Sequence, residues 1–166
     1  LLNAHFDLRN FKLFDQTLED FIAFEASETA QKYDNFRTHT SLYITTARIN
    51  GHLMKGSFTE GIRLIPEIEK KLNEYSLYVD HHRIVVFNYK FASLYFGAGE
   101  YEKAIDYLQE IINSPIDLRI DLHSYARLLH LICHYELGNY DILDSLVKAV
   151  RSEEHTSELQ SPCNLV

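Results

Sequence analysis

One short pattern recurs along this chain and restricts the folds that the chain can adopt. A glycine, a polar residue and an aromatic residue stand together at Gly56-Ser57-Phe58, Gly99-Glu100-Tyr101 and Gly138-Asn139-Tyr140. Successive glycines of this pattern are 43 and 39 residues apart, and Arg9-Asn10-Phe11 is a weaker fourth copy. A pattern that returns at a nearly fixed interval indicates a stack of similar supersecondary units.

Each triplet stands between two apolar stretches that have the spacing of a helix. The residues before Gly99, for example, include Phe91, Ala92, Leu94 and Tyr95. Glycine readily adopts the left-handed conformation that ends a helix, and Ser57 and Asn139 are suitable N-caps for the helix that follows. We therefore predict that each unit is a helix, a tight turn with a packed aromatic ring, and a second helix.

The chain contains few residues that interrupt helices, with 6 Gly and 3 Pro among its 166 residues. Residues 83–89 also suit a short strand, but they run directly into the helical pattern of residues 91–95, so we assign no strand. We predict helices at residues 11–26, 35–54, 58–74, 81–97, 101–113, 119–137 and 140–150, connections at 27–34, 75–80 and 114–118, and the end of a helix within 1–8.

The repeated unit resembles the tetratricopeptide repeat. The resemblance rests on Phe91-Ala92, Tyr95, Gly99, Tyr101, Ala104, Leu108, Ile111 and Pro115. At the position where the family has a small residue, the later copy has Leu143; the earlier copy has Pro66 inside its predicted second helix, which a proline would kink. The resemblance implies an all-α fold, a right-handed α-α superhelix or solenoid of about three to four antiparallel helix pairs, over residues 1–150.

The last residues of the chain do not follow this pattern. Residues 151–161 resemble the in-frame translation of a sequencing adapter, and the apolar periodicity stops at Val150. We therefore expect residues 151–166 to be a tail that is not native and leave them out of the fold. Leu1 is not an initiator methionine, and the native pattern stops at Val150. We therefore expect the domain to be truncated at both ends. An unfinished stack exposes apolar ends, which favours self-association.

Composition and charge argue against several classes of function. The net charge is −8 and no basic patch stands out, so we expect no nucleic acid as a partner. No apolar run approaches the roughly 20 residues that span a bilayer, so we expect no membrane insertion. Cys133 and Cys163 form no disulfide framework, which favours a reducing compartment, the cytoplasm.

His130 and His134 are the residues with the clearest metal-binding spacing. They lie one helical turn apart with Cys133 beside them. No third ligand is evident, so we interpret both as packing histidines with hydrogen-bonded nitrogens and expect no metal and no cofactor. We expect Cys133 to be a buried, inert thiol, because activation needs a base and a cationic setting. A metal-binding or pH-sensing role for His81 and His82 stays an alternative.

The sequence has no phosphate-binding loop, nucleophile elbow or paired-carboxylate motif, so we expect no enzyme. Acidic residues follow one another along the predicted helix 101–113 and at its start, namely Glu100, Glu102, Asp106 and Glu110. We interpret them as a solvated face. An acidic patch for a basic partner is the alternative.

In tetratricopeptide proteins the first helix of each pair lines a concave groove that receives peptides or helices. The resemblance assigns to this groove Tyr43, Thr46, Asn50, Tyr89, Ser93, Phe96, Tyr125, Leu128, Ile132 and Tyr135. Rigid aromatic rings bury a large area at small entropic cost, which suits peptide capture. The alternative is that these rings fill the core between repeats. Of these residues only Asn50 fits the family's clamp for a terminal carboxylate.

We therefore predict a scaffold for protein–protein interaction, which binds a peptide or helix of another protein in a concave, aromatic-lined groove. One alternative is a peptide-sensing segment of a larger signalling or regulatory protein. A further alternative is a fragment of a metal-dependent enzyme that uses His130 and His134.

Overall fold

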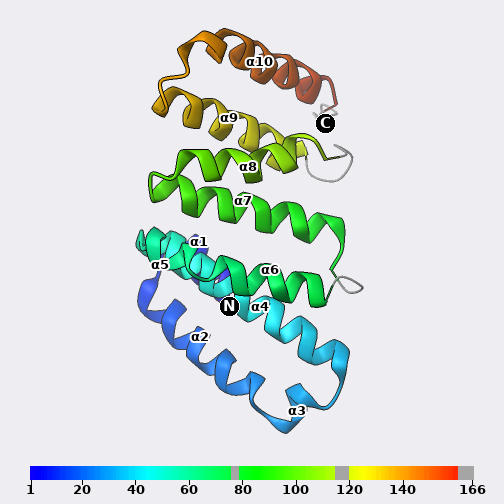
Figure 1. Ribbon diagram of the computed structural model, residues 1–166. Coiled ribbons are helices and arrows are strands. Elements are labelled where there is room, and N and C mark those ends of the chain that lie inside the picture. Colours follow the sequence, from blue (N-terminus) through cyan, green and yellow to red (C-terminus); the bar gives the residue numbers. More distant parts are fainter. Residues whose placement is uncertain (76–78, 115–119, 161–166) are drawn as a thin grey trace, which may run out of the picture. The chain divides into compact units, whose positions relative to one another are not determined.

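The computed structural model describes residues 1–75, 79–114 and 120–160, and all regular secondary structure in these ranges is helical (Figure 1). The prediction of an all-α fold is therefore confirmed for the described part of the chain. Residues 83–89, the segment that also suited a strand, are helical. The chain divides into two compact units, residues 1–87 and residues 88–166, each of which is described by itself.

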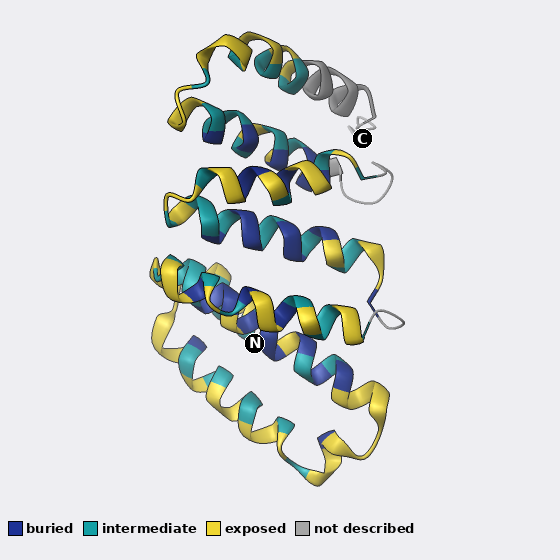
Figure 2. Cartoon of the chain, in the orientation of Figure 1, coloured by how far each residue is buried: buried dark blue, intermediate teal, exposed yellow. Residues whose placement is uncertain are grey.

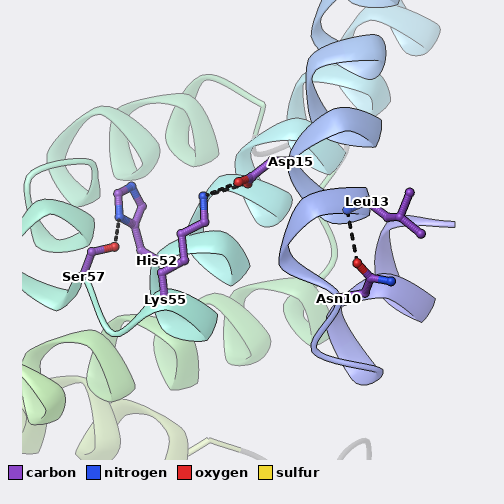
Figure 3. Close-up of polar contacts among 6 residues, drawn as sticks. All are labelled: Asn10, Leu13, Asp15, His52, Lys55 and Ser57. Atoms are coloured by element: carbon purple, nitrogen blue, oxygen red, sulfur yellow. Dashed lines mark hydrogen bonds and ion pairs between the residues drawn. The ribbon is translucent and has the colours of Figure 1, made fainter.

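Unit 1 is built from helices of unequal length. They are α1 (Leu2–Asp7), α2 (Phe11–Glu25), α3 (Glu28–Gln31), α4 (Asp34–Lys55), α5 (Phe58–Ile62), α6 (Ile65–Glu74) and the first turns of α7 (His81–Gly97). Helix α2 packs against α4, and α1 contacts both. An ion pair links α2 to α4, since Lys55 Nζ donates to the two carboxylate oxygens of Asp15 over 2.7 and 2.8 Å (Figure 3).

The packing of α2 on α4 centres on Phe14, whose side chain is fully buried. A Cβ atom at position 51 would lie 3.3 Å from Phe14 Cε1, so the glycine at this position gives the ring room against α4. Helices α4 and α6 supply further buried apolar residues of this unit, namely Leu42, Ile44, Ala47, Ile49, Ile65 and Ile68. Ala30 of α3, Val79, and Val85 and Phe87 of α7 are buried as well. Burial of these side chains is the main term that favours folding of unit 1.

Unit 2 is a run of antiparallel helices in which each packs on the next (Figure 1). It comprises the rest of α7, then α8 (Tyr101–Ile112), α9 (Ile120–Glu136), a 3-10 turn (Tyr140–Ile142) and α10 (Leu143–Gln160). The ring of Tyr107 on α8 lies between two rings of α7, with centroid distances of 5.4 Å to Phe91 and 5.6 Å to Tyr95. Asn88 Nδ2 donates to Glu110 Oε2 over 2.8 Å, so a polar contact also joins α7 to α8.

The buried residues of unit 2 follow the helical period. On α8 the side chains of Ala104, Leu108 and Ile111 are fully buried, at intervals of four and three residues, while the opposite face is exposed (Figure 2). The fully buried Ala104 is the residue that the sequence comparison matched to the small position of the tetratricopeptide pattern.

The four copies of the sequence triplet form the same turn. The residue that ends the first helix has a positive φ in every copy, with values of 51° at Arg9, 69° at Gly56, 79° at Gly99 and 75° at Gly138. The next residue then donates its N–H to the carbonyl five residues earlier. These bonds are Asn10 to His5 (2.9 Å), Ser57 to His52 (3.1 Å), Glu100 to Tyr95 (2.9 Å) and Asn139 to His134 (3.0 Å). This long bond across a left-handed residue is the signature of a Schellman helix end.

Ser57 and Asn139 occupy the N-cap positions of α5 and of the 3-10 turn, as predicted, but neither side chain accepts a capping hydrogen bond there. Each instead bonds back to a histidine in the preceding helix. Ser57 Oγ is hydrogen-bonded to His52 Nδ1 over 2.8 Å, and Asn139 Nδ2 donates to His134 Nδ1 over 3.1 Å (Figure 3 for the first). In the weaker fourth copy, by contrast, Asn10 Oδ1 does accept the Leu13 N–H over 3.3 Å (Figure 3).

Most predicted helices agree with the observed ones to within a few residues, and three predictions are corrected. The predicted helix 58–74 is two helices, because α6 begins at Ile65 with Pro66 in its first turn, where a proline displaces no hydrogen bond. The predicted connection 27–34 contains α3. Helix α10 continues past Val150 to Gln160, since no Gly or Pro interrupts it.

Candidate functional site

A groove of about 1000 Å³ opens in unit 1 between α1, α2, α4 and the first turns of α7. We call it the unit-1 groove. Helix α4 forms its floor, because α2 packs on α4 from one side and Arg83 of α7 contacts α4 at Tyr43. The deeper lining is apolar and buried, and includes Phe14, Leu42 and Ala47. The groove therefore offers a water-excluding surface with walls from three segments of the chain.

Aromatic side chains stand at the rim of the unit-1 groove. The exposed fraction is 56% for Tyr43 and 38% for Phe24, which is high for rings of this size. Phe21 stacks on Phe24 with a centroid distance of 6.3 Å, and Phe24 meets the edge of Phe36 at 6.3 Å. The rim thus presents partly exposed rings whose orientations are fixed by their neighbours, which favours binding of an apolar group.

Two charged residues also line the unit-1 groove on different helices. The Arg83 guanidinium lies 5.5 Å from the centroid of the Tyr43 ring, within the range of a cation–π contact. The backbone N–H of Arg83 donates to Asp80 Oδ1 over 2.8 Å, which fixes the start of α7. Asp20 lines the groove from α2 and is exposed. The groove therefore carries a cation on its α7 wall and an anion on its α2 wall.

Three of the residues assigned to a groove from the sequence lie in the unit-1 groove, namely Tyr43, Thr46 and Asn50. They follow one another at intervals of three and four residues on α4. Asn50 is buried, and the Thr46 hydroxyl donates to the Leu42 carbonyl over 2.8 Å. Of the three, Tyr43 has the most exposed side chain.

The sequence interpretation missed the part of the groove that α2 and the start of α7 supply. Thr17, Phe21 and Phe24 recur at helical spacing on α2 and line the groove. Helix α2 follows the turn at Arg9, so it is the second helix of its pair, and the resemblance assigns the groove to first helices only. Stepping back from Tyr89 by three and seven residues gives Val86 and His82, both of which line the groove. That periodicity is the signal that could have found them.

The other seven predicted groove residues lie on α7 and α9 in unit 2. Tyr125, Leu128 and Tyr135 are exposed by 57%, 45% and 55%, whereas Tyr89, Ser93, Phe96 and Ile132 are half-buried. Burial raises the pKa of Tyr89, and the nearby Tyr125 phenol raises it further. Tyr89 of α7 and Tyr125 and Leu128 of α9 are all at least partly exposed. We call these three residues the unit-2 face.

Two of these rings also stabilise the turns that follow them. Phe96 packs against Tyr101 with a centroid distance of 5.6 Å, and Tyr135 packs edge-on against Tyr140 at 5.8 Å. In both pairs the first ring stands three residues before the glycine and the second ring two residues after it. The aromatic residue of the repeated triplet thus packs into the turn, as the sequence predicts.

His130 and His134 form an edge-to-face pair on α9, with ring centroids 4.6 Å apart and an interplanar angle of 72°. His130 is buried, and its Nε2 has no hydrogen-bond partner among the residues that the structure describes. The expectation of hydrogen-bonded nitrogens therefore holds for His134, which bonds Asn139, and is wrong for His130 Nε2. Burial, followed by the charges of His134 and Arg127, lowers the pKa of His130 to about 4.

The remaining chemical candidates take no part in a reactive cluster within the described ranges. Cys133 is fully buried and burial raises its pKa to about 11, which supports the interpretation of an inert thiol. No group of three or more His, Cys, Asp or Glu side chains that could hold a metal occurs among the described residues. His81 is exposed at the start of α7. Glu110, from the acidic series on α8, bonds Asn88, which orients its carboxylate.

In the described ranges all regular structure is helical, and the same Schellman turn recurs at Arg9, Gly56, Gly99 and Gly138. No family model, curated protein or solved structure matches this chain. Within the described ranges, none of the helices combines the length and the apolar character needed to cross a membrane.

Proposed function

We propose that the chain is a tetratricopeptide-like interaction module whose unit-1 groove receives an apolar segment of a partner protein. The unit-1 groove is the observation that carries this proposal. Its volume of about 1000 Å³ lies at the upper end of the range typical of binding sites, and its lining of apolar residues with a few polar groups is also typical.

The rim residues favour a polypeptide as the occupant of the groove. Interfaces between proteins concentrate their binding energy in aromatic and arginine side chains that become buried on association. Tyr43, Phe24 and Arg83 are residues of these kinds, and all three line the groove. Because neighbouring rings and the Arg83–Tyr43 contact already hold their positions, little side-chain entropy is lost when a partner binds.

The four identical turns support the family resemblance. A helical-repeat protein needs a turn that returns at each repeat, and the Schellman turns at Arg9, Gly56, Gly99 and Gly138 supply it. The unit-2 face is a second contact surface in this proposal, since Tyr125 and Leu128 expose apolar area on α9.

A peptide library displayed on phage and selected against the full chain tests the proposal. We expect selection of peptides with several apolar residues, and we expect Tyr43→Ala to weaken their binding at least about tenfold, the usual cost of losing an aromatic side chain that becomes buried on binding. Affinity is measured by fluorescence anisotropy with synthetic copies of the selected peptides.

Tyr33→Ala is the matched control for this experiment. Tyr33 is an exposed tyrosine of the same unit, at 63% exposed, but it does not line the groove. Selected peptides that bind wild type and Tyr43→Ala equally, or that lose affinity equally with Tyr33→Ala, contradict the assignment of the groove.

A further inference from the structure

The chemistry of the unit-1 groove restricts what its occupant can be, and the first restriction concerns the backbone of that occupant. An extended peptide needs partners for its own N–H and C=O groups, which proteins usually supply from a sheet edge. All regular structure in the described ranges is helical, and the Thr46 hydroxyl in the groove already donates to Leu42. A helix satisfies its own backbone groups, so an apolar groove of this kind suits a helix.

The second restriction concerns charge. Arg83 is half-buried at the groove wall with its guanidinium over the Tyr43 ring, and no carboxylate in the described part of the chain lies within ion-pair distance of it. A cation at the edge of an apolar groove attracts a carboxylate more strongly than one in open solvent does, since the local dielectric constant is lower. Arginine also binds a carboxylate through two parallel N–H bonds.

The opposite wall has the opposite preference. Asp20 of α2 lines the same groove, so an acidic side chain of the occupant is repelled on that wall and attracted on the wall formed by α7. The two walls therefore distinguish the two flanks of a bound helix. A helix bound with its acidic flank toward Asp20 would be destabilised by repulsion between like charges.

Resting on the proposed function above, we propose that the occupant of the unit-1 groove is an amphipathic helix of a partner protein. Its apolar stripe contacts the floor formed by α4, and an acidic side chain on one flank of that stripe pairs with Arg83.

Two synthetic helices of about 15 residues test this inference. Both are N-acetylated and C-amidated, so neither has a terminal carboxylate, and both carry leucines at i, i+3, i+4 and i+7 spacing. One has glutamates along one flank of the leucine stripe, and the other has glutamines at the same positions. Their dissociation constants are measured by fluorescence anisotropy with wild type, Arg83→Gln and the control Arg63→Gln, which removes an exposed arginine outside the groove.

We expect wild type and Arg63→Gln to bind the glutamate peptide about 3- to 10-fold more tightly than the glutamine peptide, and Arg83→Gln to bind the two equally. Because the comparison is between two peptides on one protein, loss of the contact between Arg83 and Tyr43 cancels. Equal binding of the two peptides by wild type overturns the inference about Arg83 and leaves the proposed function intact. Failure of both peptides to bind overturns the inference and counts against the proposed function as well.

Analytical ultracentrifugation of the chain without peptide shows whether a second copy of the chain, and not a partner protein, occupies the groove. A dimer that Tyr43→Lys dissociates would assign the groove to a second copy of the chain and overturn the inference. A chain that is monomeric at the concentrations used for the peptide titrations, in wild type and in Tyr43→Lys, supports it.

Discussion

His130 shows how one buried side chain can make the stability of a domain depend on pH. The folded state holds the pKa of His130 at about 4, well below the ordinary value of 6.5, chiefly because burial disfavours the charged ring. Below about pH 6.5 His130 binds a proton in the unfolded chain but stays neutral in the folded chain. The free energy of unfolding therefore falls as pH falls. The loss levels off only below about pH 4, and we expect it to reach about 3 kcal/mol.

Urea unfolding at a series of pH values between about 4 and about 7 measures this effect. The substitution His130→Gln removes the titrating ring, so we expect the free energy of unfolding to depend less steeply on pH in this window. His81→Gln removes an exposed histidine of α7 and should leave the dependence as it is in wild type. An identical pH dependence in wild type and His130→Gln would contradict the assignment to His130.

At the scale of the helix, the end of α1 is the one repeated turn without a glycine. Arg9 has a φ of 51°, and a side chain in this left-handed region costs about 1 kcal/mol or more. Glycine avoids that cost. Glycine also raises the conformational entropy of the unfolded chain, and this entropy offsets part of the stabilisation. We expect Arg9→Gly to raise the free energy of unfolding by about 0.5 to 1 kcal/mol.

Gly99→Ala is the reverse substitution and serves as its control. A Cβ at position 99 has no neighbour within 4 Å, so only the φ of 79° opposes it, and we expect a loss of about 1 kcal/mol. Both variants are measured by urea unfolding. A destabilised Arg9→Gly would show that the Arg9 side chain makes a contribution larger than its backbone strain.

The same turns explain why the helices could be predicted and the groove only in part. A glycine with a positive φ ends a helix through a local interaction, so Gly56, Gly99 and Gly138 fixed the helix ends in advance. The break between α5 and α6 was missed because Pro66 suits either a kink or a helix start. Which faces of α2 and α7 meet across a groove depends on packing between distant segments, and therefore Phe24 and Arg83 were not found.

At the scale of the whole molecule, the division into two compact units predicts how damage to the core spreads. Phe14 is fully buried in unit 1, and Phe14→Ala leaves a cavity that costs about 3 to 5 kcal/mol. Because Phe14 belongs to a unit that is compact by itself, we expect this loss to act mainly on local opening of α2 and α4. Hydrogen exchange followed by mass spectrometry should show faster exchange in these helices and smaller changes in α8 and α9.

Leu108→Ala is the matched variant for unit 2, since Leu108 is also fully buried. It should increase exchange in α8 and α9 more than in α2 and α4, at a cost of about 2 to 5 kcal/mol. If either variant raised exchange equally in all four helices, the two units would open as one cooperative structure. A change confined to one unit would instead mean that the two units open separately. A partner bound in the unit-1 groove would then slow opening of α2 and α4 more than opening of α8 and α9, because a ligand stabilises only the states in which its site is formed.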